Sequence, residues 1–490
     1  MALNRNIAKI LNKALLGMIF TSITLTGYSQ HKNFVVINKS MSEKELVKIA
    51  ANIVPSPQQL RWQRLELTGF IHFGINTFTG REWGNGKEDP KIFNPTELDA
   101  RQWVKVCKEA GIKQVIFTAK HHDGFCLWPT KTTEHSVKNS PWKDGKGDVV
   151  KEVADACKEM GVGFGVYLSP WDMNNDSYGT DAYNDFFINQ LTELLTQYGK
   201  VDEVWFDGAN GEGPNGKKQV YDFERWYAHI RKLQPQAVIA VSGPDVRWVG
   251  TESGHGREEE WSVVPMGKKN VSTEGSQTKV DQAPAGDMTG QVLGSRAQLK
   301  DGDALKWYPA ETDVSIRPGW FYHESEDEKV KTPEYLKEIY FHSVGRNGVL
   351  LLNIPPDKRG LFTDFDVSAL KVWREKLDRI FAVNLLKRAK AVGSVKKIEP
   401  LLDDNDATHY LFPMKGSKNT VEMDMNEEKT FNVLLLQENI RIGQRVEKFV
   451  LEYWDNKEWK KAAEGSTIGF KRLLEFPTIT ASKVRLRIVS

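Results

Sequence analysis

The chain has 490 residues, of which 40% are hydrophobic and 27% are charged, a composition typical of a globular protein of two or three domains. Its 67 basic and 65 acidic residues leave a formal charge of only +2, so nothing in the charge balance indicates a nucleic-acid partner. Fifteen tryptophans is a high count; we expect most in the core and a minority stacked on sugar rings.

The first 29 residues have the pattern of a secretory signal peptide. Arg5, Lys9 and Lys13 precede an apolar stretch over residues 14–27, and small residues follow it near Ser29. This stretch is too short for a membrane span, and no later stretch reaches the required length. We therefore expect residues 1–29 to be removed, and the mature protein to be exported to the periplasm or the extracellular space.

Residues 30–383 alternate short apolar runs with amphipathic segments, which predicts strands alternating with helices. The first predicted strand ends at 71–74, and the others lie at 115–117, 163–168, 204–207, 238–241, 307–314 and 349–354. Predicted helices follow a cap at Asp99 and cover 149–160, 183–198, 221–233 and 333–344. Strands that are apolar throughout belong to a parallel sheet buried on both faces. About eight such units favour an α/β fold of the (β/α)8-barrel type over an open doubly wound sheet.

Residues 265–303 interrupt this alternation. The segment is rich in Gly, Ser, Lys, Gln and Asp and shows little periodicity, so we expect a long loop. From its place after the predicted strand at 238–241, we expect it over the catalytic face of the barrel, either covering a substrate or disordered.

After Asn384 the pattern changes to short strands separated by polar turns. These predicted strands cover 420–425, 431–437, 449–454, 467–470 and 484–489. Residues 384–490 are therefore expected to form a β-sandwich domain. Its commoner role would be to pack on the barrel, and carbohydrate binding is the alternative.

The three cysteines, Cys107, Cys126 and Cys157, have spacings that match no zinc motif. Cys107 and Cys157 lie on the apolar faces of predicted helices, where a thiol behaves as a small hydrophobic group. We expect no disulfide, no bound metal and no other cofactor.

Polar and aromatic side chains gather where the predicted barrel strands end: His72, His121, His122, Tyr167 and Asp207. The C-terminal ends of barrel strands form the functional face of such folds. Metal binding and hydrogen bonding to sugar hydroxyls both remain open for this group. Successive residues of a strand point in opposite directions, so His121 and His122 would have difficulty sharing one ion, which favours sugar binding.

Asp207 lies beside the bulky Trp205 and Phe206, and Gly208 lets a ligand approach the backbone. A retaining glycosidase needs one ionised carboxylate as its nucleophile. It also needs a second carboxyl group with a raised pKa, about 5–5.5 Å away, as its acid/base. The candidates for this second group are Glu252, the run Glu258-Glu259-Glu260, and Glu311. We expect the run to be a solvated acidic surface.

The chain resembles glycoside hydrolase family 29, the α-L-fucosidases, across most of residues 55–490. The resemblance rests on His72-Phe73-Gly74, Glu82-Trp83, His121-His122-Asp123-Gly124-Phe125, Trp128, Tyr167 and Trp205-Phe206-Asp207-Gly208. It implies that Asp207 is the nucleophile and that fucose is bound by His72, Glu82, Trp83, His121, His122 and Tyr167. It further implies a barrel, sometimes imperfectly closed, followed by a β-sandwich, and a fucosylated oligosaccharide or glycoconjugate as substrate.

The segment Arg247-Trp248-Val249-Gly250-Thr251-Glu252 resembles the branch of this family that cleaves α-1,3/4-linked fucose from branched Lewis-type oligosaccharides. In that branch the Glu of this segment is the acid/base, which implies Glu252, with Glu311 as the second candidate. Residues 315–321 are also similar to that branch, and Trp320 would line the fucose pocket near the methyl group. Arg247 is expected to touch the sugar or to favour the ionised form of Asp207.

The resulting hypothesis is a retaining exo-glycosidase that uses Asp207 and Glu252 in a double displacement. Two other classes remain open. A non-catalytic fucose-binding protein would keep the histidines but lose a carboxylate, and a metal-dependent hydrolase would lose activity to chelators. No feature of the sequence predicts an oligomeric state.

Overall fold

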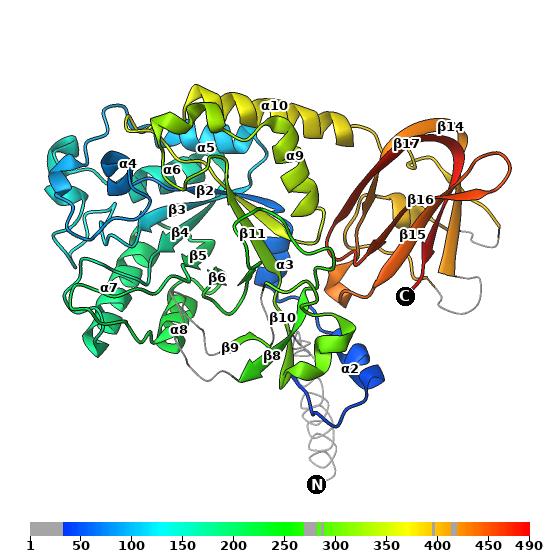
Figure 1. The fold of residues 1–490 in the computed structure, drawn as a ribbon, viewed down its shortest axis with the longest axis horizontal. Coiled ribbons are helices and arrows are strands. Elements are labelled where there is room, and N and C mark those ends of the chain that lie inside the picture. Colours follow the sequence, from blue (N-terminus) through cyan, green and yellow to red (C-terminus); the bar gives the residue numbers. More distant parts are fainter. Residues whose placement is uncertain (1–32, 269–281, 286–288, 394–396, 413–418) are drawn as a thin grey trace, which may run out of the picture. The chain divides into compact units, whose positions relative to one another are not determined.

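The computed structural model describes residues 33–268, 282–285, 289–393, 397–412 and 419–490 (Figure 1). The predicted signal peptide lies outside these residues. Among the described helices, none combines the length and the apolar character needed to cross a membrane.

Eight parallel strands form the central sheet, in the order β6-β5-β4-β3-β2-β12-β11-β7. They are β2 (Leu67–Ile71), β3 (Gln114–Lys120), β4 (Gly163–Leu168), β5 (Glu203–Phe206), β6 (Val238–Val241), β7 (Arg247–Trp248), β11 (Ala310–Ser315) and β12 (Val349–Asn353). Its two edge strands approach each other at a parallel bridge between Ala240 and Val246, so the sheet curls into a barrel. The predicted barrel is confirmed.

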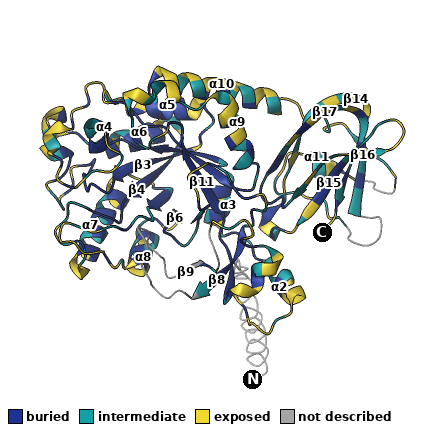
Figure 2. Ribbon diagram, in the orientation of Figure 1, coloured by how far each residue is buried: buried dark blue, intermediate teal, exposed yellow. Residues whose placement is uncertain are grey.

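Helices cover the outside of this sheet, and nearly every residue of the strands is buried (Figure 2). The described helices are α2 (Glu43–Ala50), α3 (Pro57–Gln63), α4 (Ile75–Thr79), α5 (Ala100–Glu109), α6 (Val149–Met160), α7 (Asp181–Gln197), α8 (Phe223–Leu233), α9 (Pro333–His342), α10 (Asp364–Phe381) and α11 (Glu399–Leu402). Of these, α2 packs on strands outside the barrel sheet, and α11 belongs to the C-terminal domain. Asp99 caps α5 by accepting hydrogen bonds from the backbone N–H groups of Arg101 and Gln102, as predicted. Cys107 on α5 and Cys157 on α6 are buried free thiols, as their apolar helix faces predict.

A smaller antiparallel sheet takes the place of a helix between β7 and β11. Its strands are β1 (Phe34–Val36), β8 (Val263–Lys268), β9 (Gln282–Pro284) and β10 (Ala304–Trp307), in the order β1-β10-β8-β9. The prediction of a loop over 265–303 is therefore wrong at 265–268 and 282–284, which are strands, whereas 289–303 consists of turns and a short 3-10 helix over 296–301. Residues 269–281 and 286–288 lie outside the described part. Pro265 and Gly267 interrupt the strand pattern of β8, and its partner β10 is distant in sequence.

The position expected for this segment is also wrong. The side-chain amide of Gln59 on α3 donates to the Trp307 carbonyl oxygen at 2.8 Å, and the Trp307 indole N–H donates to Gln63 at 2.9 Å. Helix α3 ends just before β2 begins, and β10 ends just before β11 begins. The small sheet thus lies at the N-terminal ends of the barrel strands, away from the face that carries the polar side chains.

The C-terminal domain is an antiparallel sheet in the order β13-β14-β17-β15-β16. Its strands are β13 (Lys390–Ala391), β14 (Thr420–Leu436), β15 (Lys448–Trp454), β16 (Trp459–Ser466) and β17 (Arg472–Ile488). The all-β domain is confirmed, although its described strands join in one sheet rather than two. The predicted strands at 420–425 and 431–437 are one strand with a pairing irregularity, and 467–470 is not a strand.

Candidate active site

The first wall of the site comes from the ends of β2 and β12. His72 follows β2, and its Nδ1 lies 2.9 Å from Oδ1 of Asn353, the last residue of β12. The Asn353 amide nitrogen donates to Ser315 Oγ and to the Trp320 carbonyl oxygen, both at 2.9 Å, which fixes the amide orientation. Nδ1 of His72 therefore carries the proton and Nε2 is an acceptor. Burial lowers the pKa of His72 to about 3, so the ring is neutral.

His121 and His122 lie side by side after β3. Their ring centroids are 4.1 Å apart, so the expectation that they point in opposite directions is wrong. Strand β3 ends at Lys120, and a turn follows in which successive side chains no longer alternate. Burial lowers the pKa of both imidazoles, which are neutral.

The two rings offer different atoms to a ligand. His122 Nδ1 lies 2.7 Å from Ser169 Oγ, and that hydroxyl donates to the Trp171 carbonyl oxygen at 2.6 Å. His122 Nδ1 is thus the donor, and its Nε2 is an acceptor 3.9 Å from Asp207 Oδ2. Among the described residues, the buried Nδ1 of His121 has no hydrogen-bond partner. Such atoms suit the hydroxyl groups of a sugar.

Asp207 follows β5, and two donors hold its carboxylate. The Tyr167 hydroxyl donates to Oδ2 at 3.1 Å, and the backbone N–H of Ala209 donates to Oδ1 at 2.7 Å. Burial and the charge of Asp207 raise the pKa of Tyr167 well above its usual value, so the phenol keeps its proton. The Tyr167 ring stacks on Trp205 at a centroid distance of 5.1 Å. With a quarter of its side-chain surface exposed, Asp207 combines a fixed orientation with access from outside.

Glu252 lies on the loop after β7. Its Oε2 accepts a hydrogen bond of 3.4 Å from the Trp320 indole N–H. Glu252 keeps an exposed surface, but desolvation by the residues around its carboxyl group raises the pKa of Glu252, and the charges of Asp207 and Glu82 raise it further. The negative charge of Asp207 therefore favours the protonated form of Glu252, and a carboxyl group with a raised pKa is suited to donating a proton.

Glu82 fixes the loop that carries Trp320. Its carboxylate accepts hydrogen bonds from the Trp320 backbone N–H and from His323 Nε2, both at 2.7 Å. The Trp320 ring lies 5.2 Å from the ring of His72. Glu82 thus holds the loop over residues 320–323, and Trp320 forms a wall beside His72.

Trp83 stands at the rim of the site. Half of its surface, 51%, is exposed. Its ring meets His122 edge-on at 5.5 Å and Trp171 edge-on at 5.4 Å. An indole held in this way presents an apolar face to solvent, as a stacking platform for a sugar requires.

Arg247 does not belong to this group, and the prediction that it touches the sugar is wrong. Its side chain has no exposed surface; it forms an ion pair with Glu260, and its Nε donates to the Tyr308 carbonyl oxygen at 2.9 Å. Glu260 is also buried and pairs with Arg257 at 3.1 Å, so the expected solvated run is wrong at this position. Burial favours the neutral acid, but Arg247 and Arg257 outweigh it and lower the pKa of Glu260.

Glu311 is also unsuited to the role of second candidate. It has no exposed surface, and its Oε1 accepts a hydrogen bond of 2.7 Å from the Trp205 indole N–H. Burial and the neighbouring Glu203 raise the pKa of Glu311 well above its usual value. A substrate cannot reach this carboxyl group, which lies inside the barrel.

Several residues of the site were not predicted: Ser169, Trp171, Phe321, His323 and Asn353. Asn353 is a polar residue at the C-terminal end of a barrel strand, as are His72 and Asp207, so its position in the sequence could have identified it. The rings of His72 and His121 meet Phe321 edge-on at 5.4 and 5.1 Å. Ser169, Trp171 and His323 contribute through hydrogen bonds and ring contacts with residues that are distant in sequence, and no local sequence pattern predicts such contacts.

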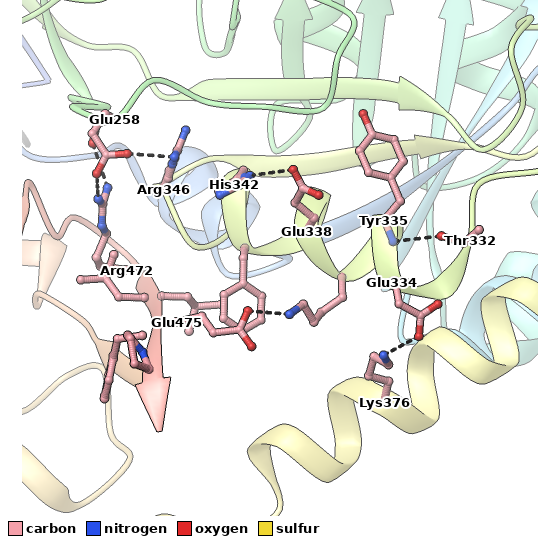
Figure 3. A pocket seen from close by; sticks show the side chains of 16 residues that line it. Glu258, Thr332, Glu334, Tyr335, Glu338, His342, Arg346, Lys376, Arg472 and Glu475 are labelled. Atoms are coloured by element: carbon pink, nitrogen blue, oxygen red, sulfur yellow. Dashed lines mark hydrogen bonds and ion pairs between the residues drawn. The ribbon is translucent and has the colours of Figure 1, made fainter. Parts of the chain in front are cut away.

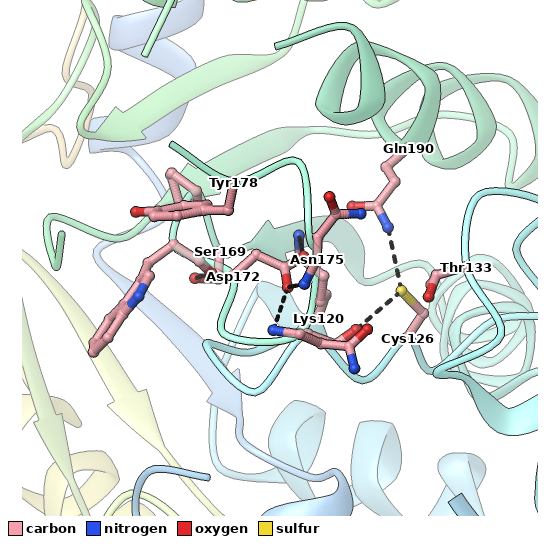
Figure 4. A network of polar contacts seen from close by, with 12 residues as sticks. Lys120, Cys126, Thr133, Ser169, Asp172, Asn175, Tyr178 and Gln190 are labelled. Carbon is pink, nitrogen blue, oxygen red and sulfur yellow. Dashed lines mark hydrogen bonds and ion pairs between the residues drawn. The ribbon is translucent and has the colours of Figure 1, made fainter. Parts of the chain in front are cut away.

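A buried ion pair between Lys120 and Asp172 lies next to the histidine turn in the chain (Figure 4 shows the pair). Lys120 Nζ lies 2.9 Å from Asp172 Oδ2, and both side chains are almost fully buried. Asp172 Oδ1 accepts hydrogen bonds of 2.9 Å from the backbone N–H groups of Asn174 and Asn175. In the same loop, the Met173 backbone N–H donates to the His122 carbonyl oxygen at 2.8 Å. The pair therefore ties the end of β3 to the loop after β4.

Comparison with known proteins extends over both domains. The family model described as Alpha-L-fucosidase matches residues 71–374. Alpha-L-fucosidase 1 of Arabidopsis thaliana is 43% identical over 447 residues, which cover 88% of this chain and 83% of that protein.

Solved structures agree with this match. A crystal structure from Bacteroides ovatus has a TM-score of 0.82 and 50% identity, covering 93% of this chain and 75% of its own. A glycoside hydrolase family 29 fucosidase of Ruminococcus gnavus, solved in complex with fucose, has a TM-score of 0.75 and 32% identity and covers 93% of this chain and 95% of its own. Matches of this extent reach beyond the barrel into the C-terminal sheet.

Proposed function

This chain belongs to the α-L-fucosidase family, glycoside hydrolase family 29, and from that membership we propose that it releases terminal α-L-fucose with retention of configuration, using Asp207 and Glu252. The observation that carries the proposal is the pairing of two unlike carboxyl groups. Asp207 is held by two donors at the end of a barrel strand, and the charge of Asp207 helps to raise the pKa of Glu252. Both groups are present, which disfavours a non-catalytic fucose-binding protein.

In the first step, a carboxylate oxygen of Asp207 attacks the anomeric carbon of fucose. The bond from that carbon to the leaving oxygen breaks, and Glu252 donates its proton to the departing oxygen. The result is a fucosyl ester on Asp207, an ionised Glu252 and a free alcohol. The Tyr167 hydroxyl and the Ala209 N–H hold Asp207 for this attack.

In the second step, Glu252 removes a proton from a water molecule that attacks the same carbon. The ester bond to Asp207 breaks, and fucose leaves with its original configuration. Glu252 is again protonated and Asp207 is again ionised, so the enzyme returns to its starting state.

The three neutral imidazoles orient the sugar rather than transfer protons. Nε2 of His72 and Nε2 of His122 accept hydrogen bonds from hydroxyl groups, and the unpartnered Nδ1 of His121 is available to another. Because burial keeps these rings neutral, they add no positive charge that would compete with the cationic transition state.

The proposal extends to linkage and location. The similarity of 247–252 and 315–321 to the α-1,3/4-specific branch supports a branched, Lewis-type substrate, for which the exposed Trp83 offers a surface beside the fucose site. The charged and apolar pattern of residues 1–29 supports export to the periplasm or beyond.

Azide separates the roles of the two carboxyl groups. Asp207→Gly is expected to lower turnover of an aryl α-L-fucoside by roughly 1,000-fold or more, and azide in place of the nucleophile gives the inverted β-fucosyl azide. In Glu252→Ala azide replaces water in the second step and gives the retained α-fucosyl azide. The product configuration is read by proton NMR.

Glu311→Gln is the matched control, because it alters a carboxyl group that substrate cannot reach. We expect no azide product from it. Retained α-fucosyl azide from Glu311→Gln, together with unaffected hydrolysis in Glu252→Ala, would contradict the assignment.

Linkage is tested by comparing initial rates on 2′-fucosyllactose and on the Lewis a and Lewis x trisaccharides. The proposal expects kcat/KM on the trisaccharides to exceed that on 2′-fucosyllactose by at least about tenfold, because a pocket that binds a branched sugar loses contacts to an unbranched one. Equal or reversed preference would place the enzyme outside the α-1,3/4 branch.

A further inference from the structure

Three possible metal ligands meet beside a pocket that the proposed reaction does not use. The pocket has a volume of about 820 Å³ and is lined by residues of α9 and β17, among them Glu338, His342 and Arg472 (Figure 3). Neither Asp207 nor Glu252 lines it. His255, three residues after Glu252, contributes the third ligand.

The three side chains point their donor atoms at one another. His255 Nε2 lies 3.9 Å from Glu338 Oε1, and His342 Nδ1 lies 3.8 Å from the same oxygen. Both distances are too long for hydrogen bonds, and the three ligand atoms lie within 4.8 Å of one another. Tetrahedral zinc has bonds of ~2.0–2.1 Å to such atoms, which places neighbouring ligand atoms about 3.3 Å apart. Small side-chain rotations would bring the three atoms to that spacing.

The protonation of His255 already suits an ion. Its Nδ1 lies 2.9 Å from the Ser253 carbonyl oxygen, which can only accept a hydrogen bond. Nδ1 therefore carries the proton, and the lone pair is on Nε2, the atom that faces Glu338. Histidines that bind metals are commonly anchored in this way, with the second ring nitrogen donating to a carbonyl oxygen.

The surroundings allow an ion to enter. Glu338 and His342 lie one helical turn apart on α9, and the side chains of His255, Glu338 and His342 are 25%, 53% and 34% exposed. The nearby Arg346 disfavours a cation, but its guanidinium forms an ion pair of 2.8 Å with Glu258. Two imidazoles and one carboxylate are a ligand set that suits zinc and related divalent ions.

We propose that His255, Glu338 and His342 bind a divalent transition-metal ion of the zinc class, which fastens the loop carrying Glu252 to α9. One contact of this kind already exists, because the Gly256 backbone N–H donates to the His342 carbonyl oxygen at 2.7 Å. The ion adds a second connection through side chains. Metal binding does not depend on the proposed function; only its consequence for an acid/base at Glu252 does.

Calorimetric titration with zinc chloride tests the site, using chelator-treated full-length protein without tag histidines. We expect about one ion per chain, with Glu338→Gln and His255→Ala each weakening binding by at least about tenfold. Glu338→Gln keeps the side-chain volume and is the variant least prone to misfold. The matched control is His229→Ala, which removes a histidine on α8 that contacts Thr192. Unchanged zinc binding in Glu338→Gln, or equal loss in His229→Ala, would overturn the site.

Amide hydrogen exchange tests the effect on the loop. Zinc should slow exchange severalfold in the peptide over 249–256, and Glu338→Gln should abolish the slowing. Exchange that zinc leaves unchanged, despite binding, would refute the fastening of the loop. Neither outcome alters the azide products of the Asp207 and Glu252 variants, so this proposal and the proposed function fail separately.

Discussion

At the scale of single residues, the site depends on hydrogen bonds that fix which atom of each side chain faces the sugar. Asn353 determines the free nitrogen of His72, and Ser169 determines that of His122. Neither partner could be assigned from its own sequence neighbourhood, although the histidines themselves could. The position of a histidine at the end of a strand predicts that its side chain reaches the site. Which ring nitrogen carries the proton cannot be predicted in this way, because it depends on a hydrogen-bond partner from another segment of the chain.

Of the two donors to Asp207, the Tyr167 hydroxyl can be removed with little other change to the site. Tyr167→Phe keeps the ring stacked on Trp205 but deletes the hydrogen bond to Asp207. Loss of a hydrogen bond to a charged group, about 1.5–3 kcal/mol, predicts a fall in kcat/KM of roughly 10- to 100-fold. Steady-state kinetics on an aryl fucoside measures it. An unchanged kcat/KM would show that Tyr167 does not hold the carboxylate during the reaction.

Glu203 and Glu311 form a second pair of buried carboxyl groups, inside the barrel, and burial raises the pKa of both. Each keeps one oxygen to which no other described group donates. Burial raises the pKa of Glu203 to about 8, despite hydrogen bonds from Gln114 and Trp62. Since the unfolded chain releases this proton near pH 4.5, ionisation of Glu203 destabilises the fold progressively between about pH 4.5 and 8.

Glu203→Gln tests this sign, because an amide resembles the protonated acid and does not titrate. We expect the free energy of unfolding of Glu203→Gln to rise relative to that of the parent as pH increases from about 4.5 to 8. The parent's own profile is clearest above pH 6.5, because buried histidines such as His72 contribute with the opposite sign below it. Urea unfolding across this range gives the difference; a pH-independent difference would mean that the pair holds no extra proton.

At the scale of elements, the sequence predicted those helices and strands whose ends are marked by nearby residues. Helix α6 and strands β4 and β6 have the predicted bounds, because capping residues and continuous apolar runs mark them. The strands β8 and β10 could not be predicted, since they pair with each other across more than thirty residues and β8 contains Pro265 and Gly267. The failure at Arg247 has a related cause: a two-residue strand gives no pattern, and its partner Glu260 is on another segment.

At the scale of the whole molecule, one buried amide connects the barrel to the C-terminal sheet. Asn347, between α9 and β12, donates to the Glu260 carbonyl oxygen and to Ser262 Oγ, both at 3.0 Å. Its own Oδ1 accepts a hydrogen bond of 2.7 Å from the Phe470 backbone N–H. Its φ of 64° is left-handed, a conformation that asparagine tolerates better than most residues. Conformation and bonding both favour this residue here.

Asn347→Ala should therefore destabilise the protein by about 2–4 kcal/mol, from lost hydrogen bonds and backbone strain together. Asn347→Gly is the matched variant, because glycine adopts this φ without strain and so isolates the hydrogen bonds. Chemical denaturation measures both, and kcat should change little in either. If both variants had the same free energy of unfolding as the parent, the Asn347 side chain would not stabilise the contact between the two domains.

The register of the barrel has a consequence for how the chain is made. Strand β2 pairs on one side with β3, close in sequence, and on the other with β12, where Leu67 lies opposite Leu350. Leu67 and Leu350 are more than 280 residues apart in the chain, so β12 is synthesised long after β2. One edge of the first barrel strand thus stays open until most of the protein has been synthesised, and this exposed edge is where a nascent chain would most need a chaperone.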